Sequence, residues 1–229
     1  MKPNELKYAP SLMCANFLRL EDDIKALEAG GCDELHFDIM DGSFVPNITL
    51  GEDFVRAVRR ATKLPFHGHL MIQHPERYVN RFVDAGCTIV SIHVEACIHA
   101  HRVLDQIRAA GASPCIAINP ATPLTKLEFL LDKADRVLVM TVDPGFAGQR
   151  IINGAYERVK ILRENIEYRK LKVDIEVDGN IDIQNAAILA NLGARVFVLG
   201  SSSIFKGNGS LEKSLPEFRS AVDLRRQQV

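Results

Sequence analysis

Four polar side chains that can bind a metal lie in or beside apolar runs of the sequence. His36 and Asp38 stand two residues apart in "ELHFDIMDGS", His69 lies in "FHGHLMI" and Asp178 lies in "IEVDGN". Side chains alternate along a strand, so His36 and Asp38 should point to the same side. A buried carboxylate needs a partner, because burying an unpaired charge is very costly. Binding one shared cation is the simplest way for these two histidines and two carboxylates to gain partners when buried.

The donor types indicate which metal such a site would hold. Imidazole and carboxylate together suit Zn²⁺, with Fe²⁺, Mn²⁺ and Co²⁺ as competitors. The alternative is a polar cluster joined by hydrogen bonds and water. The spacing favours a metal held by His36, Asp38, His69 and Asp178.

A repeating order of elements would bring these side chains together. Helix-like segments end at glycine, and a run rich in Val and Ile follows, as in "VDAGCTIVSIHVE" and "ANLGARVFVLG". Glycine just past a helix supplies a left-handed C-cap, and continuous apolar runs are typical of strands buried on both faces. Strands that alternate with helices predict a parallel sheet. Eight runs fit this pattern: 8–14, 34–40, 65–72, 89–95, 114–119, 136–142, 174–179 and 195–200.

Eight strands, each followed by a helix, predict one α/β domain over residues 1–229, a parallel (β/α)8 TIM barrel. The alternative is an open doubly wound sheet. Its usual G-x-G-x-x-G fingerprint is absent, since "SLMCANF" follows the first strand. Catalytic groups of a TIM barrel lie at the carboxyl ends of the strands, so the four polar side chains should meet there.

Composition narrows the class of partner. The chain has 229 residues, a net charge of −1 and 47 % hydrophobic residues, which is ordinary for a globular protein. Lys and Arg form no cluster, so we expect no nucleic-acid partner. No signal peptide or run long enough to span a bilayer is present, so we expect no membrane attachment. Five scattered cysteines without a C-x-x-C predict free thiols and a cytoplasmic protein.

Two glycine-containing loops suit a phosphate group. Gly145 and Gly148 lie in "VDPGFAGQR" after the sixth strand, and a helix follows. Backbone N–H groups in such a loop can approach an anion closely. Gly200, Ser201 and Ser202 lie in "LGSSSIF" at the end of the eighth strand, near the usual phosphate position of a TIM barrel.

Several long motifs occur in an order typical of one family. They are "APSLMCANF", "LHFDIMDGSFVPNITLG", "HLMI", "HPERYV", "INPATPL", "VLVMTVDPGFAGQ", "EVDG" and "GSSSIF". On these motifs the chain resembles the ribulose-phosphate 3-epimerase family over nearly its whole length. The resemblance implies a TIM barrel, an isomerase that acts on a sugar phosphate, one divalent metal that is usually zinc, and a homo-oligomer.

The resemblance also assigns roles. By motif, His36, Asp38, His69 and Asp178 correspond to the metal ligands, and Asp38 and Asp178 double as two acid/base groups. Such enzymes move a proton at C3 of a ketose phosphate through an enediolate, and inversion needs one carboxylate on each side. Residues that line the reacting centre correspond to Ser11, Met40, Met71 and Met140. Residues that grip phosphate correspond to Gly145, Phe146, Ala147, Gly148, Gln149, Gly179, Asn180, Gly200, Ser201 and Ser202.

Three positions depart from the family pattern. Asn16 stands where the family commonly has Asp, and we expect it near one end of the pocket. His67 and Gly68 replace the Asp-Val that commonly precedes the histidine of strand three. We interpret His67 as a packed, hydrogen-bonded core residue; the alternative is a residue that tunes the metal site. Asn180 replaces a glycine, and Asn tolerates left-handed backbone angles.

Alternative functions remain at this point. "SLMC" and "VDPGFAGQ" also resemble allulose-6-phosphate 3-epimerase, which acts on a hexulose phosphate. A barrel decarboxylase of the orotidine phosphate group would carry Asp-x-Lys-x-x-Asp, and the nearest run, Asp23 to Glu28, lies on a predicted helix. A non-catalytic sugar-phosphate-binding protein would have lost a ligand or an acid/base group, and all four are present. We therefore expect interconversion of D-ribulose 5-phosphate and D-xylulose 5-phosphate.

Overall fold

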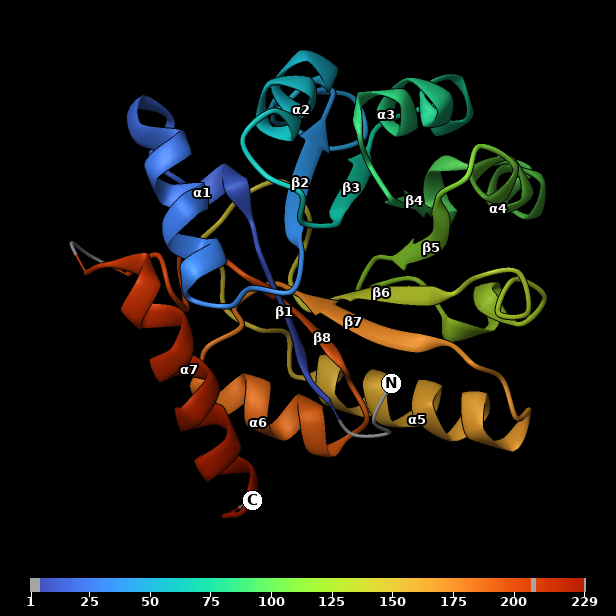
Figure 1. Ribbon diagram of the computed structural model, residues 1–229. Helices are drawn as coiled ribbons and strands as arrows, with labels where there is room; N and C mark the ends of the chain where they lie inside the picture. Colours follow the sequence, from blue (N-terminus) through green and yellow to red (C-terminus); the bar gives the residue numbers. More distant parts are fainter. Residues whose placement is uncertain (1–4, 207–208, 229) are drawn as a thin grey trace.

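The described chain forms a parallel eight-stranded sheet that curls into a barrel. The computed structural model describes residues 5–206 and 209–228. The strands lie in the centre and the helices lie around them (Figure 1). Strand order is β1-β8-β7-β6-β5-β4-β3-β2, with every pair parallel. A bridge between Ser11 and His36 joins β1 to β2 and nearly closes the ring. The predicted TIM barrel is therefore confirmed.

The strands match the eight predicted runs, but most are shorter. They are β1 (Lys7–Pro10), β2 (Leu35–Met40), β3 (Phe66–Met71), β4 (Ile89–His93), β5 (Ser113–Ile118), β6 (Arg136–Met140), β7 (Asp174–Asp178) and β8 (Val196–Leu199). The largest difference is at β1. The predicted ends of β1 and β4 form the 3-10 turns η1 (Leu12–Cys14) and η4 (Val94–Ala96). Continuous apolar character carried both predictions too far, because a buried turn at the barrel rim is as apolar as a strand.

Within residues 5–206 and 209–228, seven α-helices surround the strands. They are α1 (Leu20–Ala29), α2 (Glu52–Arg59), α3 (Val79–Ala85), α4 (Ala100–Ala109), α5 (Gly154–Tyr168), α6 (Ile183–Asn191) and α7 (Leu211–Arg226), with further 3-10 turns η2 (Phe17–Arg19) and η3 (Pro75–Arg77). The predicted helix after the fifth strand is wrong, because η5 (Leu124–Leu127) and turns fill that position. Leu124, Leu127 and Leu130 pack on the core at intervals of three, which matches three residues per turn of a 3-10 helix.

The core has two main parts, and a third, small cluster consists of Met40, Val45 and Met71. The larger part lies between strands and helices and includes Phe37, Leu70 and Ile92. A smaller cluster inside the barrel includes Cys115, Leu138 and Val198. Because successive side chains alternate, strands β4, β5, β6 and β8 contribute to both parts. The polar residues of interest share the inner side with the smaller cluster.

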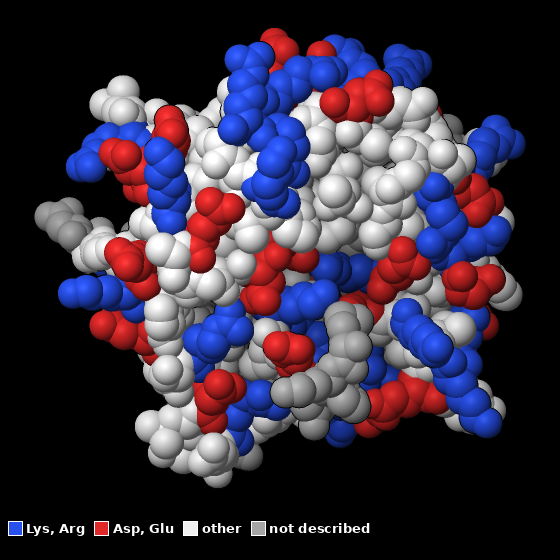
Figure 2. Space-filling view, in the orientation of Figure 1, with Lys and Arg blue, Asp and Glu red and all other residues white. Residues whose placement is uncertain are grey.

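The surface agrees with the near-zero net charge. On the face shown in Figure 2, Lys and Arg side chains are interspersed with Asp and Glu. Among the described helices, none is long and apolar enough to cross a membrane. All five cysteines are free thiols, as predicted.

Candidate active site

The four predicted metal ligands meet at one end of the barrel. His36 and Asp38 come from β2, His69 from β3 and Asp178 from β7. His36 Nε2 lies 3.3 Å from His69 Nδ1 and 3.4 Å from Asp38 Oδ1. Asp178 Oδ2 lies 3.6 Å from His69 Nδ1 and 3.9 Å from His36 Nε2. One ligand atom of each residue lies within 4.8 Å of all the others.

Sheet register explains the meeting. In the β2–β3 pair, Asp38 is the partner of His69. Both therefore project into the barrel at one level. In the β6–β7 pair, Met140 is the partner of Asp178, which places that carboxylate at the end of its strand. Residues 140 positions apart in the sequence thus share one site.

The spacing fits a small divalent cation. Ligand bonds of Zn²⁺ are about 2.0–2.2 Å long in a tetrahedral site, which places neighbouring ligand atoms roughly 3.4 Å apart. The two histidine nitrogens and Asp38 Oδ1 already have separations of 3.3 and 3.4 Å. The other oxygen of Asp38 accepts a hydrogen bond from Ser11 Oγ at 2.5 Å. Asp38 can therefore keep one oxygen for a cation.

The charges of the metal-free cluster are unequal. Burial and the nearby Asp38 raise the pKa of Asp178 to about 7. Burial also opposes ionisation of Asp38, but the neighbouring His36 and His69 lower the pKa of Asp38 below its ordinary value. Burial lowers the pKa of His69 to about 3, with only partial opposition from Asp38. For His36, burial is outweighed by Asp38 and Glu176, which raise its pKa well above the usual value. Near neutral pH, His36 and Asp38 form an ion pair beside a partly protonated Asp178.

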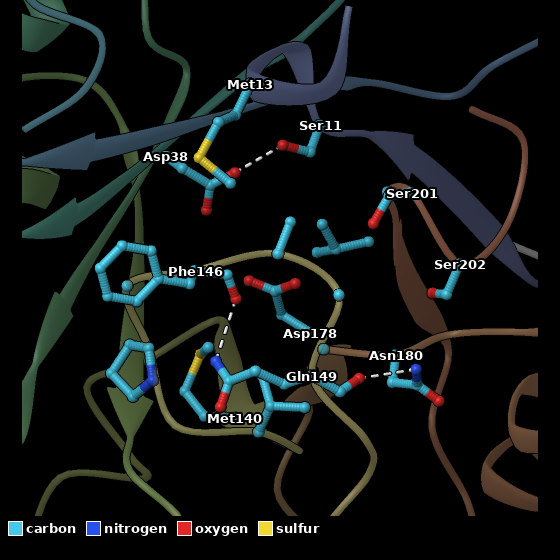
Figure 3. Close-up of a pocket in the computed structure, with 18 of the residues that line it drawn as sticks. Ser11, Met13, Asp38, Met140, Phe146, Gln149, Asp178, Asn180, Ser201 and Ser202 are labelled. Carbon is cyan, nitrogen blue, oxygen red and sulfur yellow. Dashed lines mark hydrogen bonds between the residues drawn. The ribbon is translucent and has the colours of Figure 1, made fainter. Parts of the chain in front are cut away.

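The predicted substrate residues line one pocket above this cluster. Figure 3 shows Asp178 in the middle of the pocket, with the Ser11–Asp38 hydrogen bond on one side and Ser201 and Ser202 on another. The lining includes Ser11, Met40, Met71, Met140, Gly145, Phe146, Ala147, Gly148, Gln149, Gly179, Asn180, Gly200, Ser201 and Ser202, together with Asp38 and Asp178. The structure therefore brings together every residue predicted to contact substrate.

Backbone conformation shapes the side of the pocket that Gly179 and Asn180 line. Gly179 has φ +117°, and a Cβ there would lie 2.5 Å from Val142 Cγ2, so only glycine fits. Asn180 has φ 52°, in the left-handed region that Asn tolerates. Its side-chain amide donates to Gln149 O at 2.7 Å (Figure 3). Replacement of the family's glycine by Asn180 therefore preserves the turn and adds a bond between two loops.

The prediction for Asn16 is wrong. Its side chain accepts a hydrogen bond from the backbone of Leu18 and caps η2, and its own N–H donates to Asp23. Asn16 is exposed and is absent from the pocket lining. Asparagine is a common cap residue, which accounts for its place here.

Sequence reasoning missed several residues at the site. Met13 and Cys14 line the pocket from η1, because the first strand ends earlier than predicted. His93 is the last residue of β4, and Glu95 lies in η4. His93 Nε2 lies 2.8 Å from His69 Nε2. The signal was present in "SIHVEA", which repeats the His-x-acid spacing of "LHFDIM".

Comparison with known proteins identifies the family. Residues 7–205 match the Ribulose-phosphate 3 epimerase family. The chain belongs to this family. It is 42 % identical over 215 residues to the ribulose-phosphate 3-epimerase of Bacillus subtilis, covering 93 % of this chain and 98 % of that one. It is 46 % identical over 212 residues to the enzyme of Rhodobacter capsulatus, with 93 % and 90 % covered. The chain is thus an isomerase of the epimerase type that acts on carbohydrates.

Solved structures confirm the architecture. A thiamine phosphate pyrophosphorylase from Pyrococcus furiosus superimposes with a TM-score of 0.65, at 16 % identity over 97 % of this chain and 98 % of that one. A structure described as native KDPGal gives 0.68, at 16 % identity over 97 % of both chains. At this identity the likeness concerns the barrel fold alone.

Proposed function

We propose that the chain is a metal-dependent 3-epimerase that interconverts D-ribulose 5-phosphate and D-xylulose 5-phosphate. The observation that carries the proposal is the position of the metal-ligand cluster. Four ligand-type side chains meet within 4.8 Å. Two of them, Asp38 and Asp178, also line the pocket whose far side is formed by the glycine-containing loops. One end of a sugar phosphate would thus meet the carboxylates while the other meets backbone N–H groups.

His36, Asp38, His69 and Asp178 would hold one divalent cation, with zinc the first choice and iron, manganese or cobalt as competitors. When bound, the cation would act as a Lewis acid that stabilises negative charge on substrate oxygen, worth several kcal/mol.

The two carboxylates would move the proton. Removing the C3 proton leaves a flat intermediate, and inversion needs the proton back on the opposite face. Asp38 comes from β2 and Asp178 from β7, so they approach the pocket from separate strands. In the metal-free protein the environments of the two carboxylates already differ, since Asp38 has a lowered pKa and Asp178 a pKa of about 7. In the reaction, one of them would act ionised as the base and the other protonated as the acid. Each group would contribute about 10²–10⁴-fold.

The remaining pocket residues would orient the substrate and exclude water. Met40, Met71 and Met140 are buried and present apolar thioethers that do not compete for the proton. Backbone N–H groups around Gly145–Gln149, Gly179–Asn180 and Gly200–Ser202 would bind the phosphate. That remote binding energy fixes the sugar relative to the carboxylates.

A panel of ketose phosphates in deuterated buffer tests the proposal. We expect deuterium at C3 during turnover and the highest kcat/KM for ribulose 5-phosphate. One extra carbon changes binding by only about 1–3 kcal/mol, so some activity on allulose 6-phosphate is expected. A tenfold preference for allulose 6-phosphate would overturn the pentulose assignment. No deuterium exchange with any ketose phosphate would overturn the epimerase assignment.

The cellular context stays a prediction. A homo-oligomer, a cytoplasmic location and the absence of a nucleic-acid partner all follow from the sequence and its resemblance. Light scattering of the purified protein would give the assembly state directly.

A further inference from the structure

A chain of side chains leads from His69 away from the candidate metal site. His69 Nδ1 faces the cluster, while its Nε2 lies 2.8 Å from His93 Nε2. His93 Nδ1 lies 3.3 Å from Glu95 Oε2. Glu95 Oε1 accepts the backbone N–H of Asn119 at 2.8 Å. The imidazoles of His69 and His93 are fully buried, and they stack with centroids 5.1 Å apart.

Hydrogen-bond polarity runs in one direction along this chain. An ionised carboxylate only accepts, so Glu95 requires the proton of a neutral His93 to be on Nδ1. His93 Nε2 is then an acceptor. Only one of two facing ring nitrogens can carry the hydrogen, so His69 must donate from Nε2. A neutral His69 with its proton on Nε2 has a bare lone pair on Nδ1, the atom that faces the cluster.

The opposite polarity would block the site. If His93 carried its proton on Nε2, His69 Nε2 would have to accept, and the proton of His69 would occupy Nδ1. A protonated nitrogen has no lone pair for a metal. Because an ionised Glu95 can only accept a hydrogen bond, it selects the tautomer of His93 and, through His93, the tautomer of His69.

We propose that Glu95 and His93 are positioning residues that fix the tautomer of His69, so that its Nδ1 lone pair faces the proposed metal. This deepens the proposed function and rests on it. His36 is the other histidine among the four proposed ligands. Its Nδ1, on the side away from the proposed metal, lies 3.5 Å from Glu176 Oε1, so it faces a carboxylate without an intervening histidine. Outer partners of this kind commonly change metal affinity by about 10–100-fold.

Glu95→Gln is the sharpest variant. His93 and Asn119 contact different oxygens of Glu95. A glutamine has one oxygen and one NH2 group, so it offers an acceptor at only one of these two positions. If the glutamine oxygen keeps the hydrogen bond from the backbone N–H of Asn119, its NH2 group donates to His93 Nδ1. The direction of the hydrogen bonds from His69 through His93 to residue 95 is then reversed. Glu76→Gln is the matched control, since His74 and Glu76 have the same spacing and a 3.3 Å contact on the surface.

Two readouts test the proposal in protein with ¹⁵N-labelled histidine. In the metal-free wild type, ¹⁵N chemical shifts should show the His69 proton on Nε2. Glu95→Gln should move that proton toward Nδ1 and weaken Zn²⁺ binding by about 10–100-fold, measured by chelator competition. Glu76→Gln should change neither.

A second pair of variants serves if Glu95→Gln folds poorly. His93→Gln keeps an acceptor for His69 and a donor for Glu95, while His93→Phe keeps only the ring that packs on Phe44. Zn²⁺ should bind His93→Gln more tightly than His93→Phe. A wild-type His69 with its proton on Nδ1, or unchanged tautomer and affinity in Glu95→Gln, would overturn the proposal. The tautomer is read without metal or substrate, so failure of the epimerase proposal would be seen separately.

Discussion

Two buried polar clusters lie inside the barrel and differ in how their charges are balanced. The first is the candidate metal site of His36, Asp38, His69 and Asp178. The second, which we call the arginine cluster, consists of Glu34, His67, Arg136 and Glu176. His36 belongs to the first cluster and also faces Glu176 of the second.

The arginine cluster contains its own cation, and among the described residues only His67 Nε2 of this cluster is buried without a hydrogen-bond partner. Arg136 donates to Glu34 with two nitrogens, at 2.5 and 3.1 Å, and to Glu176 at 3.0 Å. His67 Nδ1 lies 3.1 Å from Glu176, which supports its interpretation as a packed core residue. Burial opposes the charge of Arg136, but the two glutamates raise its pKa well above the ordinary value.

The metal site has no such fixed cation. Its positive charge in the metal-free protein depends on a proton at His36, and the pKa of Asp178 is raised because that carboxyl is buried and Asp38 lies beside it. Like-charged carboxylates on one site disfavour joint ionisation. The comparison teaches that the two clusters have different roles. The cluster that contains an arginine stabilises the fold. The cluster of ligand-type side chains without a Lys or Arg marks where a cation and a transferable proton would act.

Substitutions in the candidate metal site should have the largest effect on activity while leaving the protein folded. We expect Asp38→Asn and Asp178→Asn each to lower kcat by at least ~10³-fold, because each removes an acid/base group and a ligand. Both should remain folded by circular dichroism. Near-wild-type turnover in either variant would refute the two-carboxylate mechanism.

Replacement of Arg136 should mainly lower stability, in contrast to the substitutions at Asp38 and Asp178, which should mainly lower activity. Arg136→Met leaves two buried carboxylates without a cation and should lower the free energy of unfolding by about 3–5 kcal/mol. The matched control is Arg108→Met, which breaks an exposed pair with Asp135 and should cost about 0–1 kcal/mol. Urea unfolding measures both. Equal effects of the two substitutions would remove the distinction between the clusters.

The raised pKa of Asp178 predicts a smaller, pH-dependent effect in chelator-treated protein. A carboxyl that binds its proton more tightly when folded stabilises the fold below its unfolded pKa, and this stabilisation is lost as pH rises through the folded pKa. With a folded value of about 7, the loss between pH 5 and pH 7 should be about 2 kcal/mol. Asp178→Asn should remove this component, and bound Zn²⁺ should suppress it. An unchanged pH profile in Asp178→Asn would contradict the assignment.

The sequence was informative where local patterns dictate structure. Largely apolar runs located all eight strands, and His36 and Asp38 were placed on one face by alternation alone. Strand ends were less predictable, because the apolar run from Tyr8 to Cys14 covers both a strand and a buried turn.

Contacts between distant residues lay beyond local patterns. Arg136 and Glu34 are 102 positions apart, and a charged residue at a strand start would ordinarily face solvent. Only barrel closure places it inside. The contact of His93 with His69 is also set by the barrel, although the His-x-acid spacing of "IHVE" gave a local sign of it.

The central claim is that epimerisation depends on one metal bound per chain. Measuring the reaction rate as a function of the amount of bound metal tests this claim most directly. The metal-free protein should be titrated with Zn²⁺ while bound metal and ribulose 5-phosphate epimerisation are measured on the same samples. We expect activity to rise in proportion to bound metal and to level off at one metal per chain, with His69→Ala binding less and turning over more slowly. Full activity in protein shown by elemental analysis to contain no metal would contradict the account.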